Sequence, residues 1–166
     1  QVYEETSGLC PGEEVIASGT AVSVTLAPGI LNNIFDGIER PLEKIAENSG
    51  AFITRGVSVD SLDRSKKWPT HIVVSKGDYL HAGDIAEIPE THAIMHKCMV
   101  PPNMEGTVTD TAEDGEYTID ETLVTLELSD GTHRNLTMTQ HWPIRTARPT
   151  HHRFPASTPL ITGQRI

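Results

Sequence analysis

The fold class of this chain follows from one stretch of its sequence, Lys76-Gly77-Asp78-Tyr79-Leu80-His81-Ala82-Gly83-Asp84-Ile85-Ala86-Glu87-Ile88. This stretch contains two Gly-Asp dipeptides, and a mostly apolar run follows the second. Glycine and aspartate favour tight turns, because glycine adopts left-handed backbone angles and aspartate hydrogen-bonds to nearby backbone groups. Short strands set between such turns are typical of an antiparallel barrel or sandwich and not of βαβ units.

The same pattern extends on both sides of this stretch, from residue 51 to residue 139. Two more turn signals stand at Asp114-Gly115 and Asp130-Gly131. Between the turns lie further runs that we expect to form strands: Ile72-Val73-Val74, Tyr117-Thr118-Ile119 and Leu123-Val124-Thr125-Leu126-Glu127-Leu128. We therefore predict a mainly β fold, a short-stranded barrel or sandwich of the barrel-sandwich-hybrid kind, with one or two short helices.

Residues 1–27 are also expected to form short strands, because Val15-Ile16-Ala17 and Val22-Ser23-Val24-Thr25-Leu26 are β-branched runs bounded by glycine and proline. The chain opens on Gln1 in the middle of an alternating pattern, and it stops on the apolar Ile166 just after a turn signal. We expect an excised fragment of a longer chain.

Residues 28–60 change in character. The spacing Ile30-Leu31-x-x-Ile34-Phe35 is helical for about one turn. A second short helix is expected to begin with Pro41 in its first turn and to end near Gly50. From residue 141 onward, several prolines predict extended, irregular chain.

Composition and charge exclude several classes of protein. The 166 residues, of 18.1 kDa, suit one domain or slightly more. Aromatic residues make up only 5%, which excludes a core rich in tryptophan and phenylalanine. The net charge of −10 argues against a general nucleic-acid binder. All 23 acidic residues precede Gly131, and the tail after it is weakly basic, which points to a partner surface or to a piece of a larger protein.

The two cysteines, Cys10 and Cys98, are too few for a secreted disulfide framework, so we expect free thiols in a reducing compartment. The first residues are neither basic nor apolar, which argues against a signal peptide. The longest uncharged run, 15–35, is interrupted by polar residues, glycine and proline and does not suit a membrane span. We expect a soluble chain.

The sequence contains no Gly-Lys dipeptide, no G-x-G-x-x-G and no G-x-S-x-G. A P-loop needs a glycine-rich turn that ends in Gly-Lys-Ser/Thr, because the lysine reaches the terminal phosphate and the hydroxyl binds Mg²⁺. We therefore expect no nucleotide hydrolysis by this chain alone, and no catalytic, cofactor-binding or metal-ligating residue in it.

Lys97 raises an alternative function. The turns at Gly77 and Gly83, followed by a run that contains Lys97, resemble biotinyl and lipoyl carrier domains, in which a modified lysine stands on a hairpin. The neighbours His96 and Cys98 differ from the flanking methionines of biotin carriers, and the stretch before Lys97 is a few residues too long. We predict instead that Lys97 lies along an edge strand and carries no cofactor. An intact-mass measurement distinguishes the two hypotheses.

A zinc site is a further alternative. His92, His96 and Cys98 share one face of a strand, and imidazole and thiolate are good zinc ligands. No fourth ligand stands nearby, so we favour histidines that are solvated or hydrogen-bonded within the protein. Metal analysis decides between these possibilities.

The basic run Arg64-x-Lys66-Lys67-Trp68 is the third alternative, because a tryptophan beside positive charge can stack on single-stranded nucleic acid. One such cluster in an acidic chain is a weak signal. We favour a solvated turn whose tryptophan packs into the core.

Whole phrases of the sequence resemble the catalytic A subunit (alpha chain) of the rotary V-type and A-type ATPases. The phrases lie in order along nearly all of the chain: Val2-Tyr3-Glu4-Glu5-Thr6-Ser7-Gly8-Leu9, Leu26-Ala27-Pro28-Gly29-Ile30-Leu31, Phe35-Asp36-Gly37-Ile38-Glu39-Arg40-Pro41-Leu42, Phe52-Ile53-x-Arg55-Gly56-Val57, His96-Lys97-x-Met99-Val100-Pro101-Pro102, Gln140-x-Trp142-Pro143-x-Arg145 and Pro159-Leu160-Ile161-Thr162-Gly163-Gln164-Arg165-Ile166. The departures are small, such as Ala27 where the family usually has glycine and Cys10 where a small or polar residue is common.

The resemblance implies how the chain is organised. Four segments follow from it: 1–27 as the last strands of an N-terminal β-barrel, 28–60 as a short helical connection toward the nucleotide domain, 61–143 as the family's bulge, a β module, and 144–166 as an extended return segment. The P-loop of the family lies downstream of the last phrase, so none of its nucleotide-binding residues falls on this sequence.

The resemblance also implies a function for the parent protein. That protein hydrolyses or synthesises ATP with Mg²⁺ in a proton- or sodium-translocating rotary complex. It alternates with B subunits in a hexamer, meets central and peripheral stalk subunits, and lies in the cytoplasm on the soluble head of the complex. We expect this chain itself to be a structural and interaction module, without nucleic acid as a partner and without membrane insertion.

Overall fold

The computed structural model describes residues 6–17, 19–31, 33–50, 52–53, 56–57, 59–81, 83–102, 104–148, 150, 152–153 and 155–157. Within these residues there are ten strands and one helix, so the chain is mainly β, as the turn pattern predicts. In the described part of the chain no helix is long and apolar enough to cross a membrane.

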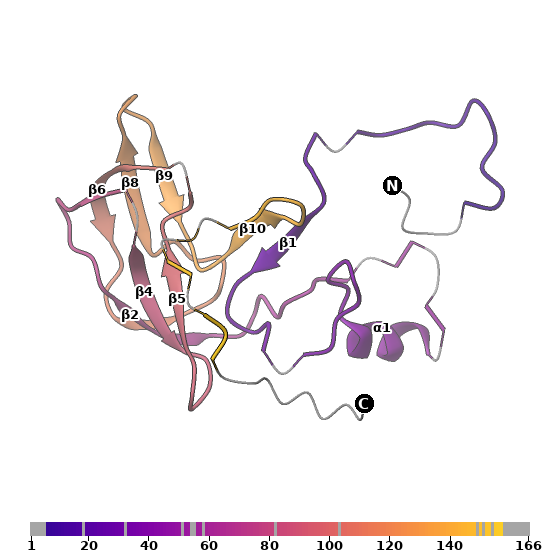
Figure 1. The fold of residues 1–166 in the computed structure, drawn as a ribbon, viewed down its shortest axis with the longest axis horizontal. Helices are drawn as coiled ribbons and strands as arrows, with labels where there is room; N and C mark the ends of the chain where they lie inside the picture. Colours follow the sequence, from indigo (N-terminus) through magenta and orange to yellow (C-terminus); the bar gives the residue numbers. More distant parts are fainter. Residues whose placement is uncertain are drawn as a thin grey trace.

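Two four-stranded antiparallel sheets form the body of the molecule (Figure 1). The first has the order β5 (Met95–Met99), β4 (Asp84–Pro89), β2 (Trp68–Ile72) and β7 (Gly115–Tyr117). The second has the order β3 (Tyr79–Leu80), β6 (Gly106–Thr111), β8 (Val124–Leu128) and β9 (His133–Leu136). We call these eight strands and their connections the β module.

One hydrophobic core lies inside the β module. In β8, Val124 and Leu126 are fully buried, whereas Thr125 and Glu127 between and after them are more exposed. Ile88 of β4 belongs to the same buried cluster, so both sheets contribute to it. Because side chains alternate between the two faces of a strand, each sheet keeps one face for the core and one for solvent.

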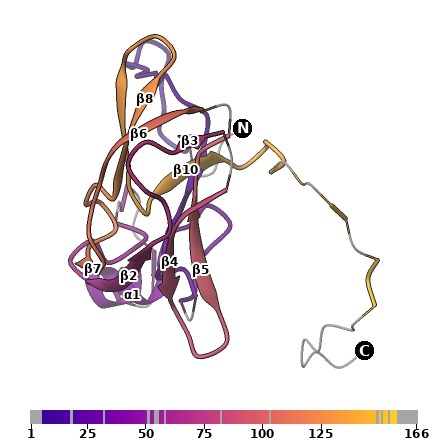
Figure 2. The same cartoon turned by 90° about the vertical axis from the view of Figure 1, so that its left-hand side faces the viewer.

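The segments before and after the β module meet in a third, two-stranded sheet. β1 (Ser23–Leu26) pairs antiparallel with β10 (Gln140–Pro143), with Leu26 opposite Gln140. Along the long axis of the molecule this pair lies between the two large sheets and the helix (Figure 1). The pairing therefore holds the strand that precedes α1 beside the strand by which the chain leaves the β module. Residues 141–143, expected from the prolines of the tail to be irregular, belong to β10, because β1 supplies a hydrogen-bonding partner. The described chain after β10 leads away from both sheets (Figure 2).

The single helix of the described residues, α1 (Leu42–Ser49), lies where the sequence places it. Pro41 stands directly before it, and Gly50 ends it by donating its N–H to the carbonyl of Ala46 at 2.8 Å. Gly50 has φ +73°, a left-handed angle that glycine adopts without strain. Ile45 is the buried residue of the helix.

Two predicted elements are wrong. The run Val15-Ile16-Ala17 forms no strand, because no described strand pairs with it, and its valine is 92% exposed. The spacing Ile30-Leu31-x-x-Ile34-Phe35 forms no helix, because one turn gives too few hydrogen bonds to offset nucleation. Instead, Asp36 Oδ1 accepts the N–H groups of Ile38 (3.0 Å) and Arg40 (2.8 Å) in a tight turn.

Two strands of the first sheet lie earlier than predicted. β2 ends at Ile72, whereas the apolar run at 72–74 predicts a strand that begins there. β7 ends at Tyr117, and Ile119 is buried in the turn that follows. These apolar runs mark residues that pack in or beside the core, whereas the position of a strand depends on its hydrogen-bonding partners.

Gly106 of β6 tests the packing between strands. It lies between Leu80 of β3 and Leu128 of β8, and a Cβ at this position would overlap the carbonyl oxygen of Glu127. We predict that Gly106→Ala lowers the free energy of unfolding by about 1–3 kcal/mol, because the ladder has to shift. Urea unfolding followed by tryptophan fluorescence measures this change.

The matched control is Gly37→Ala, since a Cβ there meets nothing within 4 Å. We expect a change of less than about 0.5 kcal/mol for this control. Equal destabilisation by the two substitutions would contradict the packing described for β6.

Candidate functional site

The carboxylate of Glu90 connects the β module to the segment before it. Glu90 directly follows Pro89 at the end of β4, and its side chain is only 4% exposed. Its Oε1 accepts hydrogen bonds from the N–H groups of Gly29 (2.6 Å) and Leu31 (3.3 Å). Its Oε2 lies 3.2 Å from Nδ1 of His96 on β5. We call Gly29, Leu31, Glu90 and His96 the joint, because one carboxylate there connects stretches 61 positions apart.

The turn that supplies the two N–H groups is itself packed into the core. Ala27 and Pro28 are fully buried, and Gly29 follows with φ +107°. Ala27 belongs to the same hydrophobic cluster as Leu62 and Trp68 of the β module. Apolar contacts therefore position the turn, and Glu90 satisfies the backbone donors that burial takes away from water.

Trp68 at the start of β2 is 5% exposed and packs in this cluster, as the sequence predicts. The ammonium of Lys66 lies 3.8 Å from the centre of its ring, a cation–π contact. Among the described residues, the indole Nε1 of Trp68 is the only buried side-chain nitrogen or oxygen that has no hydrogen-bond partner. A tryptophan buried in this way is not available to stack on nucleic-acid bases, so the structure does not support the nucleic-acid hypothesis.

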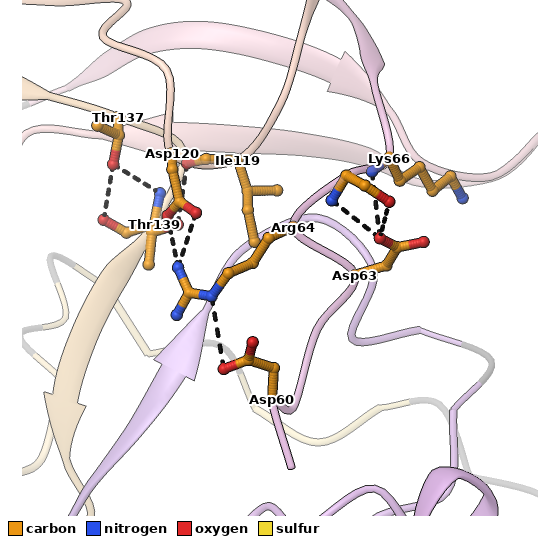
Figure 3. A network of polar contacts seen from close by, with 9 residues as sticks. Asp60, Asp63, Arg64, Lys66, Ile119, Asp120, Thr137 and Thr139 are labelled. Atoms are coloured by element: carbon orange, nitrogen blue, oxygen red, sulfur yellow. Dashed lines mark hydrogen bonds and ion pairs between the residues drawn. The ribbon is translucent and has the colours of Figure 1, made fainter.

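Arg64, from the same basic run, connects its loop to the β module (Figure 3). Its Nη1 donates to both carboxylate oxygens of Asp120, at 2.8 and 2.7 Å, and its Nε lies 3.6 Å from Asp60. The hydrogen bond and charge of Asp120 raise the pKa of Arg64 above its usual value. Nearby, the hydroxyl of Thr139 donates to the carbonyl of Ile119 at 2.9 Å. Both partners of the ion pair are about half exposed, so it contributes about 0–1 kcal/mol and mainly orients the loop.

The structure does not bring His92, His96 and Cys98 together as metal ligands. His92 is exposed in the turn before β5, His96 faces Glu90, and Cys98 is buried in the core. Burial, with a smaller contribution from Asp84, raises the pKa of the Cys98 thiol to about 12, so the thiol is protonated near neutral pH. No group of three or more His, Cys, Asp or Glu side chains suited to a metal ion occurs in the described residues.

Lys97 lies in the middle of β5, at the edge of the first sheet, and not at a turn. Its Nζ is 2.6 Å from Asp84 Oδ2 and 3.2 Å from Glu87 Oε1, and these hydrogen bonds raise its pKa. The predicted strand begins only at Met95, because the N–H of Glu90 bonds to the carbonyl of Ile94 in the preceding turn. A strand lysine paired with two carboxylates does not resemble the free hairpin lysine of a carrier domain.

The two sheets form a small antiparallel barrel-sandwich module, and the joint attaches it to the segment before it. A model of the ATP synthase alpha/beta subunit barrel-sandwich domain matches residues 59–145. The chain belongs to this family of ATP synthase subunits.

Relatives align with the whole chain. It is 50% identical over 167 residues to the A subunit of the A-type ATP synthase of Pyrococcus abyssi, and 46% identical over 167 residues to the V-type ATP synthase alpha chain of Halothermothrix orenii. It is 48% identical over 170 residues to the catalytic A subunit of the V-type proton ATPase of Dictyostelium discoideum. Each alignment includes 100% of this chain but only 16%, 28% and 27% of the respective relative. The chain thus spans less than a third of these relatives, and the resemblance expected from its sequence is confirmed.

Replacement of Glu90 tests the joint. We predict that Glu90→Ala lowers the free energy of unfolding by about 1–3 kcal/mol, because the N–H groups of Gly29 and Leu31 lose their acceptor. Hydrogen exchange at these two amides should become faster in the variant. The control Glu105→Ala removes an exposed carboxylate and should change the free energy of unfolding by less than about 0.5 kcal/mol. Unchanged exchange at both amides in Glu90→Ala would show that the carboxylate does not hold the turn.

The two thiols should differ in reactivity. Cys10 is exposed, whereas Cys98 is buried with a pKa of about 12, so at about pH 8 only about one Cys98 thiol in 10⁴ is ionised. We expect a disulfide-forming thiol reagent to label Cys10 quickly and Cys98 only after the chain unfolds in urea. Peptide mass spectrometry identifies the labelled cysteine, and rapid labelling of both in the native chain would contradict the buried position of Cys98.

Proposed function

We propose that this chain is part of the catalytic subunit of a rotary A-type or V-type ATPase. It comprises the barrel-sandwich module of that subunit and the segments that connect the module to the rest of it. The observation that carries the proposal is the identity of 46–50% along the whole chain to the corresponding subunits of such enzymes. The parent protein hydrolyses or synthesises ATP with Mg²⁺, coupled to the transport of protons or sodium ions. The chain itself is proposed to take no catalytic part.

The role proposed for the chain itself is structural. The antiparallel pairing of β1 with β10 ties the segment before the connection to the last strand of the module, which supports a module attached to a larger domain at its base. The joint at Glu90 holds the module against the segment before it, and the ion pair of Arg64 with Asp120 orients the loop that leads into β2. The proposed segments are 1–27 as the last strands of an N-terminal barrel, 28–60 as the connection, 61–143 as the bulge and 144–166 as the return toward the nucleotide domain; the family match over 59–145 supports the bounds of the third.

The proposed surroundings of the chain follow from those of the parent complex. The parent protein alternates with B subunits in a hexamer on the cytoplasmic, soluble head, and the module projects toward stalk subunits. The charge of the chain supports this proposal. All of its acidic residues precede Gly131, and many of them lie in the β module. An acidic projecting module suits docking by basic protein segments and does not suit nucleic acid.

The proposal predicts that the chain alone does not bind nucleotide. Calorimetric titration of the chain with Mg-ATP should show no saturable heat, because no Gly-Lys-Ser/Thr sequence supplies the lysine and the hydroxyl that hold phosphate and Mg²⁺. The positive control is the full-length protein from one of the relatives, which should bind. Saturable binding of Mg-ATP to the chain alone would overturn the division of roles proposed here.

A further inference from the structure

The solvent face of the first sheet carries an exposed apolar strip. Pro69 of β2, Pro89 of β4 and Met95 of β5 are all exposed, and Met95 lies opposite Pro89 in the register. Prolines donate no N–H, and the ladder between β2 and β4 is confined to the pairs of His71 with Glu87 and Ile72 with Ala86. The side chains of Pro69, Pro89 and Met95 line an open groove of about 560 Å³.

Negative charge borders this groove. The carboxylates of Glu87, Asp114 and Glu116 line it, and none of its described lining residues is a lysine or an arginine. Asp114 is held in place by the N–H of Ile72 (2.8 Å) and by Nδ1 of His71 (2.6 Å). These hydrogen bonds lower the pKa of Asp114, so it stays ionised near neutral pH.

Lys97 of β5 does not reverse this charge. It lies two positions after Met95 along the strand, and its ammonium is paired with both Asp84 and Glu87. Exposed apolar surface continues into the adjoining hairpin, where Ile94 is 47% and Met95 49% exposed. The face therefore combines a groove lined by three apolar side chains with a border of carboxylates, a combination that favours a ligand both apolar and basic.

We propose that this face, which we call the docking face and define by Pro69, Glu87, Pro89, Met95, Asp114 and Glu116, binds a protein segment with an apolar ridge flanked by lysine or arginine. The apolar ridge lies in the groove against the prolines and Met95, and the basic side chains reach the carboxylates at its border. This inference rests on the proposed function, since it names the surface and the chemistry by which the module meets a partner subunit.

The test uses the chain and a synthetic amphipathic helical peptide labelled with fluorescein. The leucines of the peptide form one stripe, and lysines flank the stripe. Two further peptides serve as probes: one with glutamate in place of lysine, and one of the same composition as the first but scrambled so that no stripe forms. Fluorescence anisotropy gives the Kd of each peptide.

Of the three peptides, we expect only the one with lysines beside the leucine stripe to bind saturably. Met95→Ser and Glu116→Lys should each weaken its binding by about tenfold, the first by removing apolar contact and the second by reversing charge. The control Glu127→Lys makes the same charge change on an exposed residue of β8 and should alter the Kd by less than about twofold.

Several outcomes would overturn the proposal. The first is that the lysine peptide does not bind, and the second is that the scrambled peptide binds equally well, which would reduce the face to a general attractor of cations. Equal weakening by Glu116→Lys and Glu127→Lys would place the site elsewhere. Self-association of the chain in sedimentation equilibrium that Met95→Ser abolishes would assign the face to a second copy. None of these outcomes affects the titration with Mg-ATP, so a failure of this inference is distinguishable from a failure of the proposed function.

Discussion

The carboxylate of Glu90 lies where water scarcely reaches it, and the way the β module meets the preceding segment depends on it. A buried carboxylate is tolerated only when hydrogen-bond donors surround it. Here two donors are backbone N–H groups of the turn after β1, and the third partner is the ring of His96 from the neighbouring strand. The turn must occupy the one position in which its apolar residues are buried and the charge of Glu90 is satisfied.

Three contacts of different physical kinds orient the module. The ladder between β1 and β10 is partly exposed and held by backbone hydrogen bonds, and the carboxylate of Glu90 is buried, whereas the half-exposed pair of Arg64 with Asp120 is weakened by salt. The docking face spans β2, β4, β5 and β7, and two of these strands lead to the joint: Glu90 follows β4, and His96 is on β5. A partner bound there would contact the two strands that lead to the joint.

Much of the β module was predictable because its turns depend on local chemistry. Glycine and aspartate favour tight turns through their own backbone, and β4 and β8 lie where the sequence places them. The burial of Trp68 and the start of α1 after Pro41 were predictable for similar reasons. The strand at Val15-Ile16-Ala17 was not, because a strand exists only when a second strand completes its hydrogen bonds.

The sequence by itself determined the fold class, the turns, the limits of α1 and the family, because glycine, aspartate and proline act on their own backbone and whole phrases identify relatives. Only the tertiary structure decided the joint. The donors to Glu90 are the backbone N–H groups of Gly29 and Leu31, which lie 61 and 59 positions before it in the sequence. Nearly every residue has a backbone N–H group, so no sequence pattern marks these two. The docking face likewise depends on the register of four strands, which places Met95 opposite Pro89 and Pro69 opposite Glu116. Register is a property of the paired strands and cannot be seen in any one of them.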